Sequence, residues 1–567
     1  MGKEKYLSPV VTVFLLLFLS ACGPLWGNPD SISTDSFPSN NESVSSLTPF
    51  LPEGYTPGSS SAATQTSALS TQTPEPDLLW ISPSAPEYLR QVALASDLPT
   101  VNDAENATIR LDISRPTDSQ TSSWIYALVV PFPTLIDSVT LVDVQNAWAG
   151  SPSGPLIGKP IWMSETTLAA FSESWGPPVA DSFRVSPANE LVDSVWADPQ
   201  GWAIVPFEEL EPRWKVLSVD GQSPVRNDFD PASYPLKINF SLQPAAFPLV
   251  PTNRDPNKLT VLAMTGVTAL VRATADRMER YGVLYPGEEI RTELRAADIT
   301  HISNEISFME GCPRPDPWTN SLQFCSDPSY IALLEDVGTD IVELTGNHLL
   351  DYGPDATLST LDMYDARGWR YFGGGRNLLD SLQPALMEHN GNKLAFIGCN
   401  YAGPPNDWAT ETRPGSAPCD FDQLTAEISN LRSSGYQPIV TLQYNEYYQP
   451  NPTDYERRDF LRMASAGAVI VSGSQAHMPA TMEFSGGSFV HYGLGNLFFD
   501  QMSHLMPDGT LITDTRNVFV DLHAFYAGRY IGTELLTYII EDYARPRPMT
   551  EKERDNFLQE IFREGGW

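Results

Sequence analysis

Apolar runs of strand length alternate with segments of helical spacing in the second half of the chain. The apolar runs predict six strands, at residues 259–264, 299–302, 340–344, 394–397, 438–442 and 468–471. The intervening segments predict helices at residues 329–337, 356–366, 421–433 and 455–466. Such alternation is typical of an α/β domain with parallel strands, whose functional site lies beyond the carboxyl ends of the strands.

Short apolar runs separated by turn residues characterise the chain before residue 250. They predict strands at residues 124–130, 138–142, 202–206, 214–219 and 236–242. A polar segment rich in Pro and Asn follows at residues 249–258, as expected of a linker. We therefore expect a smaller α+β accessory domain at residues 78–250 and a larger α/β domain at residues 251–567.

The N-terminus has the pattern of a secretory signal peptide. Lys3 and Lys5 precede an apolar run at residues 10–19, which is too short to be a comfortable membrane-spanning helix. The sequence Leu19-Ser20-Ala21-Cys22 resembles a bacterial lipobox, after which the cysteine is lipidated. Residues 1–22 are therefore predicted to be a lipoprotein signal peptide with the lipid on Cys22. The alternative is an ordinary signal peptide with an incidental cysteine.

Residues 23–77 change to a composition of Ser, Thr, Pro, Asn and Gly with little charge. Such a segment buries too little apolar surface to offset the entropy of ordering, so it is predicted to be a flexible stalk. The chain as a whole is expected to be an exported, membrane-anchored lipoprotein that faces the cell exterior or the periplasm.

The charge of the chain excludes some partners. There are 70 Asp and Glu residues against 35 Lys and Arg, which gives a formal net charge of −35 at pH 7. An acidic surface repels phosphate backbones and anionic headgroups, so neither a nucleic-acid partner nor a polybasic membrane contact is expected. With 567 residues, of which 41% are hydrophobic, the chain can form several domains with sizeable cores.

Export also gives a role to the five cysteines. Setting Cys22 aside leaves Cys312, Cys325, Cys399 and Cys419, an even number in an oxidising compartment, which predicts disulfides. Three connectivities are open, and the simplest is sequential, Cys312 with Cys325 and Cys399 with Cys419. A zinc site is the less favoured alternative, because no pair has the spacing of a zinc knuckle.

Polar clusters follow the predicted strands of the second half. They are Thr265-Gly266-Val267-Thr268, Ser303-Asn304-Glu305, Thr345-Gly346-Asn347-His348, and Ser472-Gly473-Ser474-Gln475-Ala476-His477. Carboxylate, amide and imidazole groups at strand ends suit a catalytic or metal-binding rim. No Gly-x-Ser-x-Gly elbow lies between a strand and a helix, so serine hydrolysis is not expected.

Three stretches resemble the CapA family of poly-γ-glutamate capsule synthesis proteins. They are DIVELTGNHLLDYG at residues 340–353, SGSQAHMP at residues 472–479 and YGLGNLFFD at residues 492–500. The resemblance extends over most of the second domain and keeps the motifs in order. It implies the calcineurin-like metallophosphoesterase superfamily, with an αββα sandwich after the smaller α+β domain.

The resemblance also implies a metal site. Two divalent ions, Mn, Zn or Fe, would activate a water and polarise a phosphoryl-type oxygen. At the matching positions Glu305, Asn347 and His477 are metal ligands. His348 is the catalytic residue, which protonates the leaving group or stabilises developing charge.

Three positions depart from the family pattern. Val267 stands where the family has a carboxylate ligand, while Gln443 and Gln475 stand where it has histidines. A neutral amide is a weak ligand and Val offers none, so a full two-metal site would lose much of its affinity. The two glutamines are instead expected to keep hydrogen bonds in the pocket wall, near Asp351 and Asn304.

Two further alternatives concern the same residues. A single-metal site of Glu305, Asn347 and His477 is one, with Asp351, Asp298 or Glu446 as substitute ligands. The other is structural: Asn347 and His348 cap the following helix, Glu305 is ion-paired, and His477 is a rim histidine with satisfied hydrogen bonds.

Part of the accessory domain resembles another family. The stretch GWAIVPFEELEPRWKVLSVDG at residues 201–221, followed by Tyr234-Pro235-Leu236, is similar to the second lobe of phosphate-type periplasmic solute-binding proteins. It contains no ligand-contact signature, so an unassigned α+β module is the alternative for residues 78–250.

Three functional hypotheses follow. The first is a lipoprotein that makes, retains or releases an extracellular anionic polymer such as poly-γ-glutamate by metal-assisted hydrolysis or transfer. The second is a catalytically inactive phosphoesterase-fold module that binds a polymer or another cell-envelope component. The third is a solute-binding receptor that acts through residues 78–250. Metal content separates the first two, and the acidic charge counts against tight binding of a polyanion.

Overall fold

The computed structural model describes residues 76–118, 120–198, 200–319 and 321–567. The predicted signal peptide with Cys22, and all but the last two residues of the predicted stalk, lie outside these ranges. Within them, none of the helices combines the length and the apolar character needed to cross a membrane.

One mixed sheet occupies residues 79–243, in the order β1-β2-β9-β3-β7-β5-β6, with β8 attached to β3 and β4 to β8. Its strands are β1 (Leu79–Ile81), β2 (Ile109–Ile113), β3 (Thr121–Pro131), β4 (Ser138–Val139), β5 (Ile161–Met163), β6 (Phe183–Val185), β7 (Trp202–Pro206), β8 (Trp214–Val219) and β9 (Lys237–Gln243). The helices here are α1 (Glu87–Leu94), α2 (Leu141–Trp148), α3 (Glu165–Trp175) and α4 (Leu191–Trp196).

One predicted strand of this region is half wrong. The pattern at residues 138–142 predicts a strand, but only Ser138–Val139 is extended, and helix α2 begins at Leu141. The side chain of Thr140 accepts a hydrogen bond from the Asp143 backbone N–H, and the Thr140 backbone N–H donates one to the Asp143 carboxylate. This capping box starts a helix inside an apolar run that is too short to reveal its period.

A second sheet has the order β14-β13-β12-β10-β26-β27-β28. Strands β10, β12, β13 and β14 are parallel, whereas β26, β27 and β28 are antiparallel. Their bounds are β10 (Leu259–Thr265), β12 (Ile299–Asn304), β13 (Ile341–Glu343), β14 (Arg370–Phe372), β26 (Asn517–Tyr526), β27 (Arg529–Glu541) and β28 (Arg545–Pro548), with β11 (Val267–Thr268) and β23 (Asn496–Phe498) beside them.

A third sheet has the order β16-β17-β19-β20-β22-β21 and a parallel centre. Its strands are β16 (Ala385–His389), β17 (Asn392–Asn400), β19 (Gln437–Gln443), β20 (Ile470–Gly473), β21 (Met482–Ser485) and β22 (Ser488–His491). Two short pairs complete the strands: β15 (Gly374–Gly375) with β18 (Gly415–Ser416), and β24 (His504–Leu505) with β25 (Leu511–Ile512).

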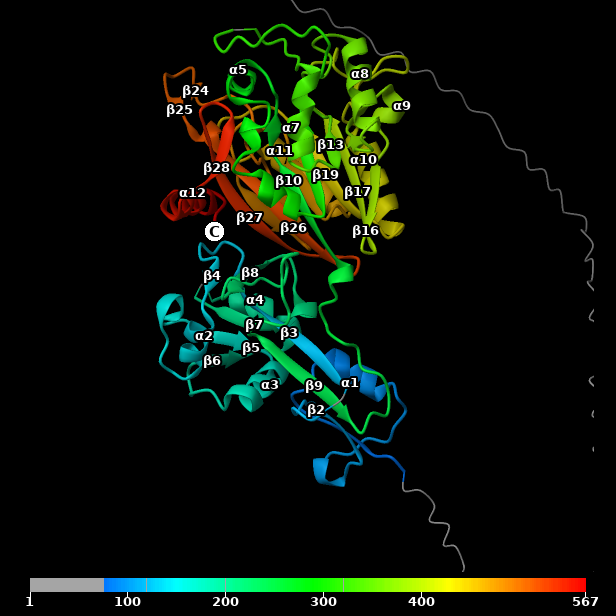
Figure 1. Ribbon diagram of the computed structural model, residues 1–567, viewed down its shortest axis with the longest axis vertical. Coiled ribbons are helices and arrows are strands. Elements are labelled where there is room, and N and C mark those ends of the chain that lie inside the picture. The colour runs from blue at the N-terminus through cyan, green and yellow to red at the C-terminus, as the bar shows by residue number, and fades with distance from the viewer. Residues whose placement is uncertain (1–75, 119, 199, 320) are drawn as a thin grey trace, which may run out of the picture. The chain divides into compact units, whose positions relative to one another are not determined.

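The second and third sheets pack face to face between two helical layers. Along β10, Leu262 and Met264 lie in one buried cluster with Phe396 and Ile439 of the third sheet, whereas Val261 lies in another. This alternation is what a strand with one face toward a partner sheet and the other toward helices requires. The predicted αββα architecture is confirmed (Figure 1).

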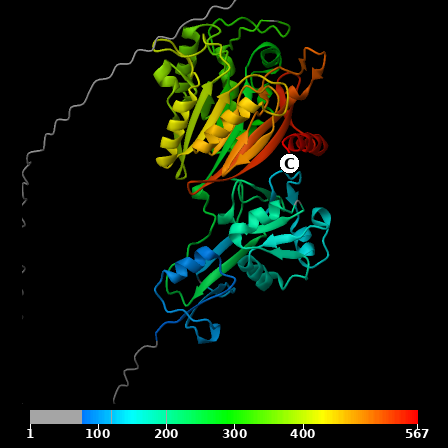
Figure 2. The same ribbon diagram turned by 180° about the vertical axis from the view of Figure 1, so that it is seen from behind.

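The helices form the outer layers. Leu333 and Leu361 lie on the buried side of the second sheet's helices, while Leu424, Ile428 and Phe460 pack against the third sheet. Figure 2 shows the yellow helices beside that sheet. The bounds are α5 (Arg272–Tyr281), α6 (Arg291–Ala296), α7 (Ile331–Asp336), α8 (Pro354–Asp365), α9 (Leu378–Ser381), α10 (Phe421–Ser433), α11 (Asp454–Ala466) and α12 (Glu551–Glu564).

Two disulfides fasten loops on the strand-end side of the sandwich. Cys312 is bonded to Cys325, and Cys399 is bonded to Cys419. Of the three connectivities that the sequence leaves open, the sequential one is therefore confirmed.

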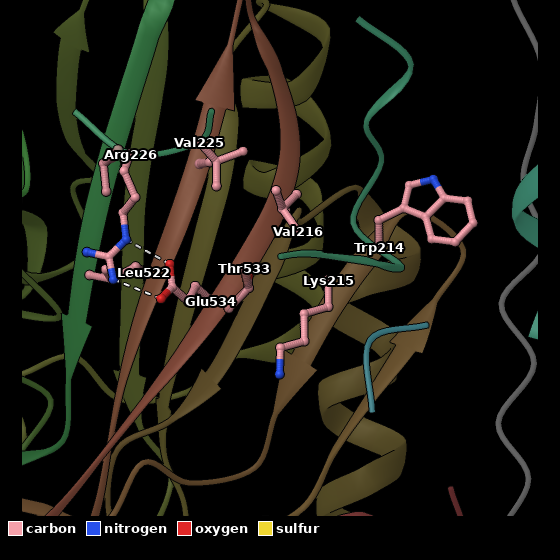
Figure 3. A pocket seen from close by; sticks show the side chains of 11 residues that line it. Trp214, Lys215, Val216, Val225, Arg226, Leu522, Thr533 and Glu534 are labelled. Atoms are coloured by element: carbon pink, nitrogen blue, oxygen red, sulfur yellow. Dashed lines mark hydrogen bonds and ion pairs between the residues drawn. The ribbon is translucent and has the colours of Figure 1, made fainter. Parts of the chain in front are cut away.

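Arg226 ties the loop after β8 to the second sheet. Its Nε and Nη2 atoms each donate to a different oxygen of Glu534 on β27 at 2.8 Å, and its Nη1 atom donates to Glu293 of α6. Figure 3 shows the paired guanidinium and carboxylate in a small cavity that Trp214 and Lys215 also line.

Candidate functional site

A glutamine amide lies at the centre of the strand-end region. Strand β19 ends at Gln443, which pairs in register with Asn400 of β17 and is 2% exposed. Its Nε2 atom donates hydrogen bonds to Glu305 Oε1 at 3.2 Å and to Asn347 Oδ1 at 3.1 Å. Because an ionised carboxylate only accepts hydrogen bonds, Glu305 fixes which way the amide points. A neutral donor thus joins Glu305 and Asn347.

Hydrogen bonds continue inward from the other end of this amide. Ser474 Oγ donates to Gln443 Oε1 at 3.0 Å and lies 3.1 Å from Thr345 Oγ1. Thr345 donates to Glu343 Oε1, and His301 Nε2 lies 3.2 Å from Glu343 Oε2. All of these side chains are buried. We call Gln443, Ser474, Thr345, Glu343 and His301 the buried polar chain.

Glu343 anchors the buried polar chain. Burial alone would raise the pKa of its carboxyl, but the contacts with His301 and Thr345 outweigh burial and hold the pKa below its ordinary value. Glu343 therefore keeps its charge between the sheets and holds the Thr345 hydroxyl toward itself. Loss of either contact would leave the buried charge less well compensated, which is costly.

A glycine allows Glu305 and Asn347 to approach each other. Strands β12 and β13 run parallel, so the loops that carry the two side chains leave the sheet at the same edge. A Cβ atom on Gly346 would lie 2.7 Å from Glu305 Cγ and 2.8 Å from its Cα, closer than real Cβ contacts come. The Gly-Asn-His sequence is therefore a steric requirement of this corner as well as a source of polar groups.

An imidazole–carboxylate pair lies in the same loop. His348 Nδ1 is 2.8 Å from Asp351 Oδ2. The backbone N–H of Phe324 donates to the same Asp351 oxygen at 2.7 Å, and the Phe324 ring packs on the imidazole with centroids 4.6 Å apart. Because the carboxylate accepts, Nδ1 carries the proton and Nε2 is left for another partner. The neighbouring Cys325 ties Phe324 to the disulfide loop.

His348 and Asp407 both have raised pKa values. Burial lowers the pKa of the imidazole, but Asp351, Glu305 and Asp407 outweigh burial and raise the pKa above its ordinary value. Burial raises the pKa of Asp407 to about 6, and the charge of Asp351 adds to the rise. The Asp407 carboxyl therefore titrates closer to neutral pH than an ordinary aspartate, and the His348 imidazole keeps its proton to a higher pH than an ordinary histidine.

His477 makes separate contacts. Its Nδ1 atom lies 2.8 Å from Asn496 Oδ1, and the amide of Asn496 donates to the backbone oxygens of His477 and Thr515. The ring packs on Phe499 with centroids 5.0 Å apart. Gln475, two residues earlier, is 6% exposed, and its Oε1 atom has no hydrogen-bond partner among the described residues.

Three other predicted residues point elsewhere. Asn304 donates to Ile306 O and to the Tyr364 hydroxyl, so its amide faces helix α8. Asp298 precedes β12 at the opposite end of the sheet and accepts a hydrogen bond from the Val261 backbone. Glu446 is exposed and contacts Tyr448.

These contacts decide whether the residues fit the metal centre that the CapA resemblance implies. Gln443 directs N–H groups at the two oxygens that would have to face an ion, and an N–H group repels a cation. Val267 is buried and offers no ligand. Across the described ranges, no group of three or more His, Cys, Asp or Glu side chains is placed to hold a metal ion. The residues therefore do not fit a two-metal centre.

Several residues of the site were missed by the sequence reasoning. Asp407 lies in the loop after β17, and Phe324 lies beside a cysteine, with no motif around either. Thr345 and Ser474 belong to the polar clusters found in the sequence but were given no role there, and Glu343 lies two residues before one of these clusters. Polar side chains at the last residues of a buried strand can therefore belong to a site, as can those that follow the strand.

The PGA_cap sequence family covers this part of the chain. Residues 261–501 match the model of the family described as bacterial capsule synthesis protein PGA_cap. We refer to these residues, which are similar to that family, as the PGA_cap domain. The predicted similarity to the CapA family is thereby confirmed, and the PGA_cap domain contains the whole buried polar chain together with His348, Asp351, Asp407 and His477.

Similar proteins are known from other bacteria. The chain is 24% identical over 278 residues to the capsule biosynthesis protein CapA of Bacillus anthracis, which covers 46% of this chain and 67% of that protein. It is 24% identical over 221 residues to the PGA biosynthesis protein CapA of Bacillus subtilis, covering 38% of this chain and 57% of that protein. Among solved structures, the NAD nucleotidase of Haemophilus influenzae is 10% identical and covers 54% of this chain and 56% of its own, with a TM-score of 0.28.

Proposed function

We propose that the chain acts at the cell envelope in making or retaining an extracellular polymer of capsule type, such as poly-γ-glutamate. The PGA_cap domain binds the polymer at the strand-end site, and a lipid on Cys22 anchors the chain to the membrane. The similarity to two capsule proteins supports the process, although it spans only 67% and 57% of their lengths. The lipobox-like sequence supports the anchor.

The Gln443 amide is the observation that favours binding over metal-assisted hydrolysis. It donates hydrogen bonds to the oxygens of Glu305 and Asn347, which would bind metal ions according to the resemblance. Its own oxygen is held by Ser474 at 3.0 Å, so the amide is fixed at both ends. What remains accessible is a set of half-buried polar groups, Asn347, His348 and Asp351, which suits recognition of a hydrogen-bonding chain.

Polymer binding by the full-length chain tests this proposal. We expect capsule or envelope polymer to be retained equally with and without EDTA, and its chain length to stay unchanged. Asn347→Ala should weaken binding, while Asn430→Ala, on an exposed position of α10, should not. Stoichiometric bound metal, together with polymer cleavage that is lost in His477→Ala, would instead establish the metal-assisted alternative.

A second candidate function lies in residues 78–250. A cavity of about 650 Å³ is lined by the hydroxyls of Ser164, Thr166 and Ser186. It also meets Tyr126, whose buried hydroxyl has no hydrogen-bond partner among the described residues. Burial and the charge of Glu208 raise the pKa of the lining residue Glu209 to about 7. These features favour a small polar solute as occupant.

Thermal shifts of the full-length chain test the second candidate. Small oxyanions, sugars and amino acids would be screened for a rise in the unfolding midpoint. A shift that Tyr126→Phe abolishes and that Tyr88→Phe, on an exposed ring, preserves would support a receptor function. An absence of any shift, or equal shifts in both variants, would count against it.

A further inference from the structure

The loop between the cysteines of the first disulfide lines a cavity beside the strand-end site. The cavity has a volume of about 270 Å³, and its wall includes Arg272, Arg314, Phe324 and Tyr352. The ring of Phe324 also packs on the ring of His348, with centroids 4.6 Å apart. The cavity and the strand-end site therefore share a wall, so one extended ligand can reach both.

Arg272 is held firmly in this wall. Its backbone φ angle is 44°, in the left-handed region that residues other than glycine rarely adopt. Its Cζ atom lies 5.0 Å from the ring centroids of both Phe324 and Phe499, while Nε and Nη2 donate to Asp500 Oδ1 at 3.1 and 2.5 Å. Strained backbones persist where the surroundings fix them, and they cluster at ligand-binding sites. Among the described residues Nη1 has no acceptor, so this fixed guanidinium keeps one donor group for a ligand.

Arg314 adds a second guanidinium on a restricted backbone. It stands between Pro313 and Pro315, whose rings fix their own φ angles and restrict the residue before each of them. Two residues before Arg314, Cys312 fastens the segment through its disulfide with Cys325. Arg314 is exposed, and no described residue forms an ion pair or a hydrogen bond with its guanidinium. A guanidinium binds a carboxylate through two parallel hydrogen bonds, and a restricted segment loses less conformational entropy in doing so.

The two aspartates in the cavity wall are engaged by their own segments. Asp316 Oδ1 accepts a hydrogen bond from the Trp318 N–H at 3.0 Å. Asp327 Oδ1 accepts from the N–H and the hydroxyl of Ser329 at 2.9 and 2.6 Å. Each aspartate thus stabilises a turn or the start of a helix rather than an arginine, so Arg314 is left to pair with a carboxylate from outside the chain.

We propose that this cavity receives a carboxylate group of the bound polymer, with Arg314 as its ion-pair partner and Nη1 of Arg272 as a second donor. This inference rests on the proposed polymer-binding function and identifies the polymer as a polycarboxylate, such as poly-γ-glutamate. It also explains how an acidic chain can bind a polyanion, because two arginines give one part of its surface a local positive charge.

Calorimetric titration of the full-length chain tests this inference with three polymers of similar length. Poly-γ-glutamate carries the carboxylates, poly-γ-glutamine keeps the same backbone without the charge, and polyphosphate keeps the negative charge without carboxylates. We expect poly-γ-glutamate to bind at least tenfold more tightly than the other two, with an affinity that falls as salt is added.

Two variants separate the role of Arg314 from a general charge effect. Arg314→Gln should weaken poly-γ-glutamate binding about tenfold and make it less dependent on salt, because one ion pair is lost. Arg370→Gln removes an exposed arginine at the start of β14, the opposite end of the second sheet, and should leave binding unchanged. Both side chains are exposed, so both variants should unfold at the same temperature as the natural chain, which excludes misfolding as the cause.

The remaining outcomes also decide the question. Equal affinity of Arg314→Gln and the natural chain for poly-γ-glutamate, with binding still weakened by Asn347→Ala, would overturn the inference and leave polymer binding intact. Equal binding of poly-γ-glutamine, or a preference for polyphosphate, would overturn the carboxylate as the group recognised. Failure to bind poly-γ-glutamate while capsule or envelope polymer is retained would overturn the inference alone. Failure to retain any of these polymers would overturn the proposed function as well.

Discussion

The side chain of Gln443 governs what the strand-end site accepts. An imidazole or carboxylate at that position would direct lone pairs toward Glu305 and Asn347, whereas the amide directs two N–H groups at them. The same amide is held by Ser474 and, through Thr345, by the buried charge of Glu343. The amide of Gln443 therefore occupies, with its hydrogen bonds, the two oxygens that a cation would need as ligands.

Replacement of the two glutamines should restore metal binding. In a Gln443→His/Gln475→His variant the N–H groups facing Glu305 and Asn347 are lost and two imidazole ligands are gained. We expect about one equivalent of Mn, Zn or Fe per chain by elemental analysis, with a higher unfolding midpoint when metal is present. The natural chain and a Gln423→His control, on the exposed start of α10, should hold no stoichiometric metal.

The amino-acid sequence alone predicted only part of this site. Asn347, His348 and Glu305 could be found because each follows an apolar run, and the family pattern marks their positions. Asp407 could not, because its surroundings depend on how the loop after β17 returns to meet the loop after β13. The contact between Gln443 and Glu305 joins residues 138 positions apart, so it arises only once the two sheets pack.

Among the elements, two helices begin with the same Thr-x-x-Glu capping box but hold its glutamate in opposite environments. Thr453 caps α11 with Glu456, and Thr550 caps α12 with Glu553. Burial raises the pKa of Glu456 to about 7, whereas Arg547 holds the pKa of Glu553 below its ordinary value. The same local motif therefore has opposite effects on stability as pH changes.

Glu456→Gln should stabilise the chain at high pH. Glu456 has a higher pKa in the folded chain than in the unfolded chain, so its ionisation between about pH 4.5 and 7 favours unfolding. The Gln variant escapes this loss and should be more stable than the natural chain by on the order of 2 kcal/mol at pH 8 and by little at pH 4. Thermal unfolding across this pH range measures the difference.

The matched variant Glu553→Gln should behave in the opposite way. Its lowered pKa means that ionisation stabilises the folded chain above the unfolded pKa, and that this stability is lost as pH falls. Glu553→Gln should therefore lower the unfolding midpoint at pH 7 and have little effect in strong acid. Parallel curves for the two glutamine variants would contradict this account.

Removal of the first disulfide should loosen the loop that carries Phe324. The bridge closes a separation of 13 residues, so the Cys312→Ser/Cys325→Ser variant should lose about 2–3 kcal/mol of stability by denaturant unfolding. Phe324 would also hold Asp351 less firmly, so the pKa of His348, followed by NMR, should fall toward its ordinary value. Unchanged stability together with an unchanged pKa would contradict this role for the loop.

The elements themselves were mostly predictable. The segment predicted at residues 421–433 is α10 to the residue, and residues 202–206 and 214–219 are β7 and β8, because turn residues or caps bound each of them. The long antiparallel strands β26 and β27 were not predicted. Both faces of these strands are buried over much of their length, so their sequences show no regular alternation of polar and apolar residues.

At the scale of the whole molecule, the side chain of Arg226 joins parts of the chain that are distant in the sequence. It binds Glu534, more than 300 residues away in the sequence, and also contacts Glu293. All three side chains are partly buried, so their charges are screened less than surface pairs. Sequence reasoning could not find this contact, because each residue is an ordinary charged residue in its own segment.

Arg226→Ala should destabilise the chain by about 1–2 kcal/mol, because it leaves two carboxylates close together without their shared cation. Arg563→Ala is the matched control, since that side chain is 67% exposed and its partners lie on the same helix. Chemical denaturation of both variants gives the comparison. Equal effects would show that the Arg226 contacts contribute no more than an ordinary surface pair.

The order of the cysteines along the chain has a consequence for biosynthesis. Cys312 pairs with Cys325 and Cys399 with Cys419, so the two loops are neither nested nor interleaved. As the chain emerges from its N-terminal side, each of these cysteines meets its native partner before the next pair has arrived. An oxidant is then enough to complete both bonds, and no reshuffling by a disulfide isomerase is required.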